Sequence, residues 1–316
     1  MLWYYMYEKT SMANGKLVAV PTSVYKRRWY ILLVFSINCL WSSTIWLTWG
    51  PVEKLALIAF PAWSDGTIAL FTNWGSFLFF PILVPCMMLI NKSVRLSVVT
   101  ASGLMALGTC LRCIKFVVPS VSDAVFTATC HICAALCAVS GIVFCSAPAL
   151  VSATWFPAGE RVTATSVSLV SLGLGSGVSF LLASEIVRTV GPSDAHVNNS
   201  CGHITNNNQT VGNHSAADIE FYKNEIGNYM FAIAGPSLAF FILVLVYFPS
   251  KPPLPPSSVI ESDKLRLFEG MKQILKNKAG WILMIVNGLS QAICGAWGAM
   301  MVTNLSMVSS HGRCLR

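Results

Sequence analysis

The sequence predicts an all-α membrane protein with about seven transmembrane helices, and three observations support this fold class. Only 11% of the 316 residues are charged, about half the fraction that is usual in a soluble domain. Apolar residues make up 54% of the chain and are grouped into long, mostly uncharged runs. Each run is long enough to cross a hydrocarbon core about 30 Å thick as a helix, which satisfies its own backbone hydrogen bonds.

Seven apolar runs set the positions of the predicted spans. They cover residues 29–49, 67–90, 96–118, 125–147, 162–186, 229–248 and 281–304. The first run starts late, is too long and lacks a following small-residue cleavage site, which excludes a signal peptide. We therefore expect five parts, namely a cytoplasmic N-terminus (1–28), a six-helix bundle (29–248), a cytoplasmic linker (249–280), a seventh helix (281–304) and a tail (305–316).

Basic residues gather on one side of the predicted membrane. They precede the first span, lie between the second and third spans, and recur between the sixth and seventh, as Lys26, Arg27, Arg28, Lys92, Arg95, Lys251, Lys264, Arg266, Lys272, Lys276 and Lys278. If the spans alternate in direction, the positive-inside rule makes this side the cytoplasm. The loops at 51–65, 119–124 and 187–228 then face the opposite compartment.

The loop at 187–228 is polar and rich in asparagine. It holds three N-x-S/T acceptors for glycans, at Asn198, Asn208 and Asn213. Glycans are added only in the secretory lumen, so these acceptors agree with the side predicted from the basic residues. The same loop contains histidines in flexible, low-complexity sequence, which favours a solvated loop over a metal site or a pH sensor.

The linker after the sixth span predicts a particular transporter plan. Its "KPPLPP" cannot continue a helix. An amphipathic helix is expected to follow, because apolar residues recur there at helical spacing, at Leu267, Phe268, Met271, Ile274 and Leu275. A six-helix bundle, an amphipathic cytoplasmic linker and the first helix of a second bundle form the plan of a major facilitator transporter. A seven-helix receptor is the alternative, but its N-terminus would lie outside, whereas the basic flank predicts an internal one.

Polar and aromatic residues within the first two spans are candidates for substrate contact, because polar groups are costly in hydrocarbon. These candidates are Asn38, Ser42, Trp46, Trp49, Asn73 and Trp74. An indole face can stack on a flat ring or hold a cation. The alternative is structural, because tryptophan is also enriched at membrane interfaces and polar residues also serve helix contacts.

Charged and titratable residues in or near the spans are candidates for proton coupling and gating. His131, the one histidine within a predicted span, titrates between acidic and neutral pH and is a candidate to carry a coupling proton, with Glu185 a second candidate. Packing is the alternative for His131. Arg112 either gates the pathway or extends to the headgroups. Glu160 and Arg161 in "WFPAGER" are expected to pair with neighbouring cytoplasmic loops and to bias the inward or outward state.

Cysteine pairs and a glycine-rich stretch do not predict enzyme chemistry. "CLRC" and "CHIC" have zinc-ribbon spacing but lie in apolar helices, where thiols usually pack as small hydrophobic groups. Gly173, Gly175 and Gly177 follow no strand, so they predict a close helix–helix approach rather than a phosphate loop. We expect no enzyme, no metal, no cofactor and no nucleic-acid partner. The expected partners are a small-molecule substrate, protons and the lipid bilayer.

Several motifs resemble solute carrier family 49 over residues 26–297. They are "YKRRWYILLVFS", "TIWLTWGPVEKLA", "GTCLRCI", "VSATWFPAGERVTATSVSLVS" and "VYFPSKPPLPPSSV". The resemblance implies twelve helices with alternating access, and Trp46 matches an aromatic residue that contacts the ligand in the family. The most similar branch implies a lysosomal, proton-coupled exporter of a small organic solute, with pyridoxine as that solute. Sister branches imply choline, ethanolamine or haem transport at the plasma membrane as the alternative.

The sequence departs from the family pattern in four respects. It ends after the seventh span, so we expect a shortened form, with a dimeric half-transporter or a non-transporting receptor or scaffold as alternatives. The N-terminus lacks an acidic dileucine sorting signal. The superfamily's G-x-x-x-D-x-x-G-R motif is degraded, with Gly75 too far upstream and Asn91 near the place of the acid, so an altered gating latch is expected. Glycine-rich sequence around Gly173 replaces the amide of the choline-handling branches, which disfavours choline.

Overall fold

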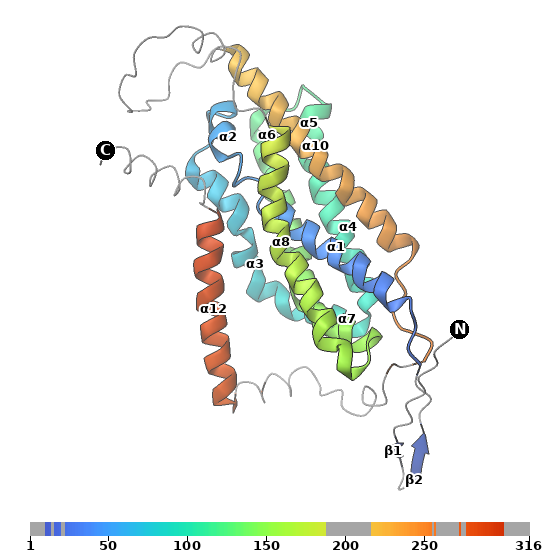
Figure 1. The fold of residues 1–316 in the computed structure, drawn as a ribbon. Helices are drawn as coiled ribbons and strands as arrows, with labels where there is room; N and C mark the ends of the chain where they lie inside the picture. Colours follow the sequence, from blue (N-terminus) through green and yellow to red (C-terminus); the bar gives the residue numbers. More distant parts are fainter. Residues whose placement is uncertain are drawn as a thin grey trace, which may run out of the picture.

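The computed structural model describes residues 10–13, 16–19, 23–187, 216–254, 256, 272 and 276–299. Within these residues the chain is almost entirely helical, and six helices are long and apolar enough to cross a membrane. They are α1 (Arg28–Trp46), α3 (Asp65–Lys92), α4 (Val94–Arg112), α6 (Asp123–Ser146), α8 (Arg161–Ile186) and α10 (Ala216–Val246) (Figure 1). They correspond to the first six predicted spans and confirm the all-α membrane fold class.

The seventh predicted span begins within helix α12 (Lys278–Ala299), which is not one of these six helices. Residues 300–304 of that prediction lie outside the described residues. The same holds for the three glycan acceptors, Asn198, Asn208 and Asn213, and for the apolar residues of the predicted linker helix.

Short elements that the hydropathy pattern did not predict precede the first span or connect the spans. They are strands β1 (Thr10–Ala13) and β2 (Lys16–Ala19), which form an antiparallel hairpin, and helices α2 (Glu53–Ala59), α5 (Ile114–Val117), α7 (Pro148–Trp155) and η1 (Ala158–Glu160). The third predicted span therefore ends at Arg112, before α5. Helix α7 starts at a proline, which is suited to the first turn of a helix because it lacks an N–H group.

Helix α10 begins at Ala216, whereas the sequence predicted a loop as far as residue 228. The first turns of α10 are charged and amide-rich, so they give no hydropathy signal for a span. A helix can nevertheless continue past the hydrocarbon core, because water and headgroups solvate its polar side chains there. The predicted loop of 187–228 is therefore helical over its last thirteen residues, 216–228.

Serine side chains fix the starts of three membrane helices. Ser64 and Thr67 form a reciprocal capping box at the start of α3, with both bonds at 3.3 Å. Ser93 Oγ accepts a bond from the Leu96 N–H at 3.3 Å, and Ser122 Oγ accepts one from the Val125 N–H at 3.4 Å. These caps satisfy N–H groups that the first turn of a helix leaves without a partner.

Helix α1 packs against α8, α6 and α10, while α4 packs between α6 and α10, and α3 packs mainly against α6. The approach of α1 and α8 is close because Gly175 has no side chain. A Cβ atom at Gly175 would lie 2.0 Å from the carbonyl oxygen of Leu40. Thr44 Oγ1 donates to the Gly175 carbonyl at 2.9 Å across the same contact. The predicted close approach is therefore found at Gly175, whereas a Cβ at Gly173 or Gly177 would meet nothing within 4 Å.

We predict that Gly175→Ala destabilises the bundle by roughly 2 kcal/mol or more, because the added methyl group meets backbone that cannot move aside. Gly173→Ala is the matched control and should be neutral or slightly stabilising, since alanine favours helix and the site is open. The thermal unfolding midpoints of the two purified variants measure this difference. Equal midpoints would contradict the close contact between α1 and α8.

Candidate functional site

Aromatic side chains from four segments meet beyond the end of α1. The Trp49 ring lies with its centroid 5.2 Å from that of Trp63 and 5.5 Å from that of Phe71 on α3. Trp63 stacks on Phe60 at 4.5 Å and on Phe126 of α6 at 5.8 Å. Trp49 is buried in this cluster, so its ring is packed against protein rather than open to a solute.

His131 joins α6 to α3 beside this cluster. The indole Nε1–H of Trp74 donates a hydrogen bond to His131 Nδ1 at 3.0 Å. The imidazole ring of His131 also lies 4.7 Å from the ring of Phe71. Because Nδ1 accepts this bond, the neutral ring carries its proton on Nε2. The structure thus brings together two residues that the sequence assigned to different roles.

Trp46 and Asn73 lie where α1 meets the same part of α3. Trp46 Nε1 donates to the Thr72 carbonyl at 3.0 Å, and its side chain is 41% exposed. Asn73 is exposed, and its Nδ2 donates to the Ala69 carbonyl at 2.8 Å within α3. Since the indole N–H of Trp46 already donates to Thr72, the part of Trp46 that is left to contact a solute is the face of the ring. Residues 71–74 of α3 therefore carry contacts to both α1 and α6.

Asn38 and Ser42 lie deeper in the bundle, in helix contacts. Asn38 is fully buried, and its Nδ2 donates to the Val34 carbonyl at 2.9 Å. Its Oδ1 has no hydrogen-bond partner among the described residues. Ser42 is also buried, and its Oγ would lie 3.8 Å from a Cβ at Gly141 of α6. Both side chains are therefore packed inside the bundle.

Arg112 is buried inside the bundle rather than extended toward headgroups. Its side chain is 2% exposed, and its Cζ lies 5.7 Å from the centroid of the Trp49 ring. Within the described residues, its Nε and Nη2 have no hydrogen-bond partner. Such a buried cation is costly unless another group satisfies it.

The cysteines near Arg112 are free thiols. Cys133 and Cys137, one turn apart on α6, have sulfur atoms 3.9 Å apart, and neither forms a disulfide. Cys110, Cys113 and Cys130 are free as well. In the described part of the chain, no group of three or more histidine, cysteine or acidic side chains is arranged to hold a metal ion.

The two gating candidates at the other end of the bundle contact their own bundle. Arg28 Nη2 donates to Glu160 Oε1 at 3.0 Å, which ties the start of α1 to η1. Arg161 Nε donates to the Phe156 carbonyl at 3.2 Å. Glu185, the second proton-coupling candidate, is exposed in the last turn of α8.

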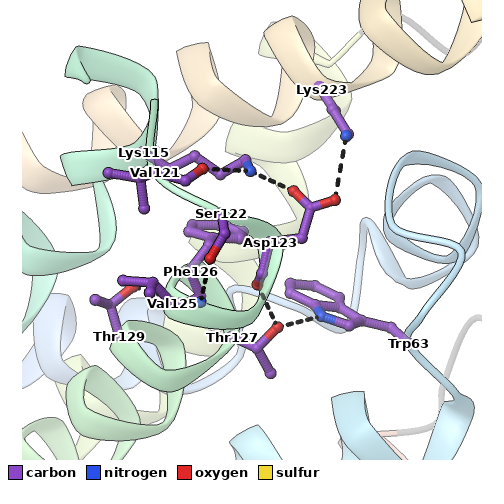
Figure 2. Close-up of polar contacts among 10 residues, drawn as sticks. All are labelled: Trp63, Lys115, Val121, Ser122, Asp123, Val125, Phe126, Thr127, Thr129 and Lys223. Carbon is purple, nitrogen blue, oxygen red and sulfur yellow. Dashed lines mark hydrogen bonds and ion pairs between the residues drawn. The ribbon is translucent and has the colours of Figure 1, made fainter. Parts of the chain in front are cut away.

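A polar network ties α5, α6 and α10 together at the end of the bundle remote from Arg28 (Figure 2). The Asp123 carboxylate pairs with Lys115 and, at 3.6 Å, with Lys223. Trp63 Nε1 donates to Thr127 Oγ1 at 2.8 Å, and Thr127 Oγ1 in turn donates to the Asp123 carbonyl at 2.8 Å. The sequence analysis missed this network. The sequence carries one signal for it, because opposite charges occur at the ends of three predicted segments on the same side of the membrane.

Comparison with known proteins finds relatives that belong to a family of solute carriers. No family model matches it. It is 29% identical over 278 residues to the solute carrier family 49 member 4 homolog of Xenopus tropicalis, covering 88% of this chain and 56% of that protein. The chain is thus related to solute carrier family 49. This confirms the resemblance carried by the sequence motifs.

A second relative and a solved structure are also similar to this chain. The choline/ethanolamine transporter FLVCR1 of Mus terricolor is 27% identical over 241 residues, covering 75% of this chain and 39% of that protein. A bacterial homolog of the human lysosomal transporter Spinster, solved in an inward-facing and unoccupied conformation, has a TM-score of 0.54 at 14% identity. This match covers 82% of the chain and 51% of that structure. It confirms the fold, a bundle of membrane-spanning helices.

The chain spans about half the length of the curated relatives it matches. The relatives are named as transporters rather than enzymes, in agreement with the expectation from the sequence.

We predict that Arg112→Met leaves the stability of the protein unchanged or raises it by about 1–4 kcal/mol, because the variant removes an uncompensated buried charge. The thermal unfolding midpoint measures this effect, with Lys54→Met as a control at an exposed lysine on α2. A gating role requires that Arg112→Met also lose transport while remaining folded. A large loss of stability would instead show that Arg112 has a strong partner in the folded protein.

Proposed function

We propose that this chain forms one six-helix bundle of a secondary active transporter, which moves a small organic solute across the lysosomal membrane in a proton-coupled cycle. The proposed solute is a pyridoxine-like vitamin. Support comes from the transporter names of the relatives, from the family motifs of the sequence, and from a titratable contact at the candidate site. Alternating access requires a second bundle. We assign that role to further residues of the same gene product or to a second copy of this chain.

The observation that carries the proposal is the hydrogen bond from Trp74 to His131. The pKa of an unperturbed histidine is about 6.5, which lies between the pH of an acidic lysosomal lumen and that of the cytosol. A neutral His131 accepts the Trp74 bond at Nδ1, whereas a protonated ring has donors at both nitrogens and no acceptor. Protonation therefore breaks a link between α3 and α6. This gives a bound proton a direct mechanical effect at the candidate site.

The residues around this link are suited to a flat, polar solute. Trp46 offers an exposed indole face, because its N–H group is already bonded to Thr72. Asn73 lies next to Thr72 on α3, with an exposed amide oxygen to accept a bond from a solute hydroxyl group. An aromatic face and an amide acceptor match a hydroxylated pyridine ring. Movement of α3 on protonation of His131 would then shift Asn73 and the bond to Trp46 together.

We predict that His131→Asn removes the pH dependence of transport without loss of folded protein. The assay measures uptake of labelled pyridoxine into membrane vesicles containing the native gene product, with and without a pH gradient. Wild-type uptake should respond to the gradient, and His131→Asn uptake should not. His203→Asn is the control, because it removes a histidine from the polar loop outside the predicted spans.

A second variant separates the hydrogen bond from the histidine itself. Trp74→Phe keeps an aromatic ring but removes the donor, so it should shift the pH profile of uptake while retaining transport. A wild-type profile in both His131→Asn and Trp74→Phe would overturn the coupling proposal. Uptake of choline or ethanolamine instead of pyridoxine would support the sister-branch alternative. Folded protein that transports none of these solutes would support a receptor or scaffold.

A further inference from the structure

A groove separates α5 from the first turns of α10, at the end of the bundle that carries the Asp123 network. Its volume is about 650 Å³. Both apolar and polar residues line it, with Phe116 and Phe231 among the former and Lys115, Glu220, Lys223 and Asn224 among the latter. A groove with this lining is suited to a ligand that is itself part apolar and part charged.

The length of α10 places this groove at the level of lipid headgroups. The helix has 31 residues and is therefore about 46 Å long, against a hydrocarbon core of about 30 Å. Its apolar part begins at Tyr229, and the polar turns before it extend past the core. Phe231 then lies at the edge of the hydrocarbon. Lys223 lies about 12 Å nearer to water along the helix.

The floor of the groove is apolar and closely packed. A Cβ atom at Gly227 would lie 2.8 Å from the Phe116 ring, so the absence of a side chain at Gly227 lets α10 approach α5. The Phe116 ring packs in turn against Phe126 at 5.4 Å and Phe231 at 6.4 Å. Because Phe116 and Phe231 line the groove, they are suited to contact an acyl chain.

In the polar part of the groove two lysines lie beside the Asp123 carboxylate, and Glu220 adds a second carboxylate. Lys115 and Lys223 share one anionic partner, Asp123, which does not line the groove, and Lys115 also donates to the Val121 carbonyl at 3.2 Å (Figure 2). Their side chains are 13% and 30% exposed. Among the described residues, the ammonium group of Lys223 meets an anion only at 3.6 Å, which leaves donors for a ligand. Glu220, one turn from Lys223 toward water, is exposed.

We propose that this groove binds a zwitterionic phospholipid of the adjacent leaflet. Its phosphate lies against Lys115 and Lys223, its amine lies toward Glu220, and one acyl chain follows Phe116 and Phe231. The mixture of two lysines and a glutamate fits a headgroup that carries both charges better than one with a net negative charge. A phosphate between the two lysines also gives them a second anionic partner besides Asp123. The inference does not depend on which solute is transported.

The test is native mass spectrometry of the full gene product, purified in mild detergent and titrated with phosphatidylethanolamine. We expect saturable binding of one phospholipid that Lys223→Gln weakens roughly tenfold, as the loss of one charge-assisted bond predicts. Asn224→Trp should also prevent binding, because the exposed side chain would fill the groove without entering the core. Lys92→Gln is the matched control, an exposed lysine in the last turn of α3 that should bind lipid as the wild type does.

Lipid analogues and the same variants also define the results that would overturn the proposal. Diacylglycerol with the same acyl chains should bind at least tenfold more weakly, because it lacks the phosphate. Equal binding of diacylglycerol would exclude recognition of the headgroup, and tighter binding of phosphatidylglycerol would exclude the role of Glu220. Unchanged binding in both Lys223→Gln and Asn224→Trp would place the lipid elsewhere. Wild-type protein without saturable binding would show that the groove is filled by the protein itself.

Discussion

Within hydrocarbon, a polar side chain cannot turn to water, and the arrangement of this bundle depends on how each such group finds a partner. Many hydroxyl groups bond to a carbonyl of their own helix, as Ser102 does with Val98 at 2.8 Å and Thr109 with Met105 at 3.0 Å. These groups then require nothing from neighbouring helices. The polar groups left over are those that link helices or lack a partner, and they identify the residues with a role beyond helix formation.

Inter-helix polar links distinguish a rigid part of the bundle from an adjustable one. Buried bonds join α1 to α10 through Trp41 and Ser237 at 2.8 Å, and α8 to α10 through Ser179 and Tyr229 at 3.2 Å. The approach at Gly175 fixes α1 against α8. Helix α3 is different, because much of its surface is exposed and its side-chain links to α1 and α6 are the bonds of Trp46 and Trp74. A change at His131 therefore acts directly on the contact between α3 and α6.

Hydropathy was sufficient to predict the six spans, because long apolar runs have few alternatives to crossing the membrane as helices. It could not place the start of α10, since charged turns outside the hydrocarbon look like a loop. Glycine spacing predicted a close approach in α8 but could not tell Gly175 from Gly173, because the contact depends on which face of α8 meets α1.

The candidate site could be predicted only in part. His131 was recognisable as titratable, but its bond to Trp74 depends on the register of α3 against α6. Arg112 was placed near headgroups by default, whereas packing against Trp49 turned it inward.

The ion pairs lie at the two ends of the bundle, where water screens them. Arg28 and Glu160 tie α1 to η1 at one end, and Asp123 joins α5, α6 and α10 at the other. Such partly exposed pairs contribute at most about 1 kcal/mol each, so they resist movement of the ends only weakly. The buried contact between α1 and α8 involves backbone atoms and resists movement strongly. In the proposed transport cycle we therefore expect α1, α8 and α10 to stay together and α3 to move. The bond between Trp74 and His131 and the exposed indole face of Trp46 both lie at α3.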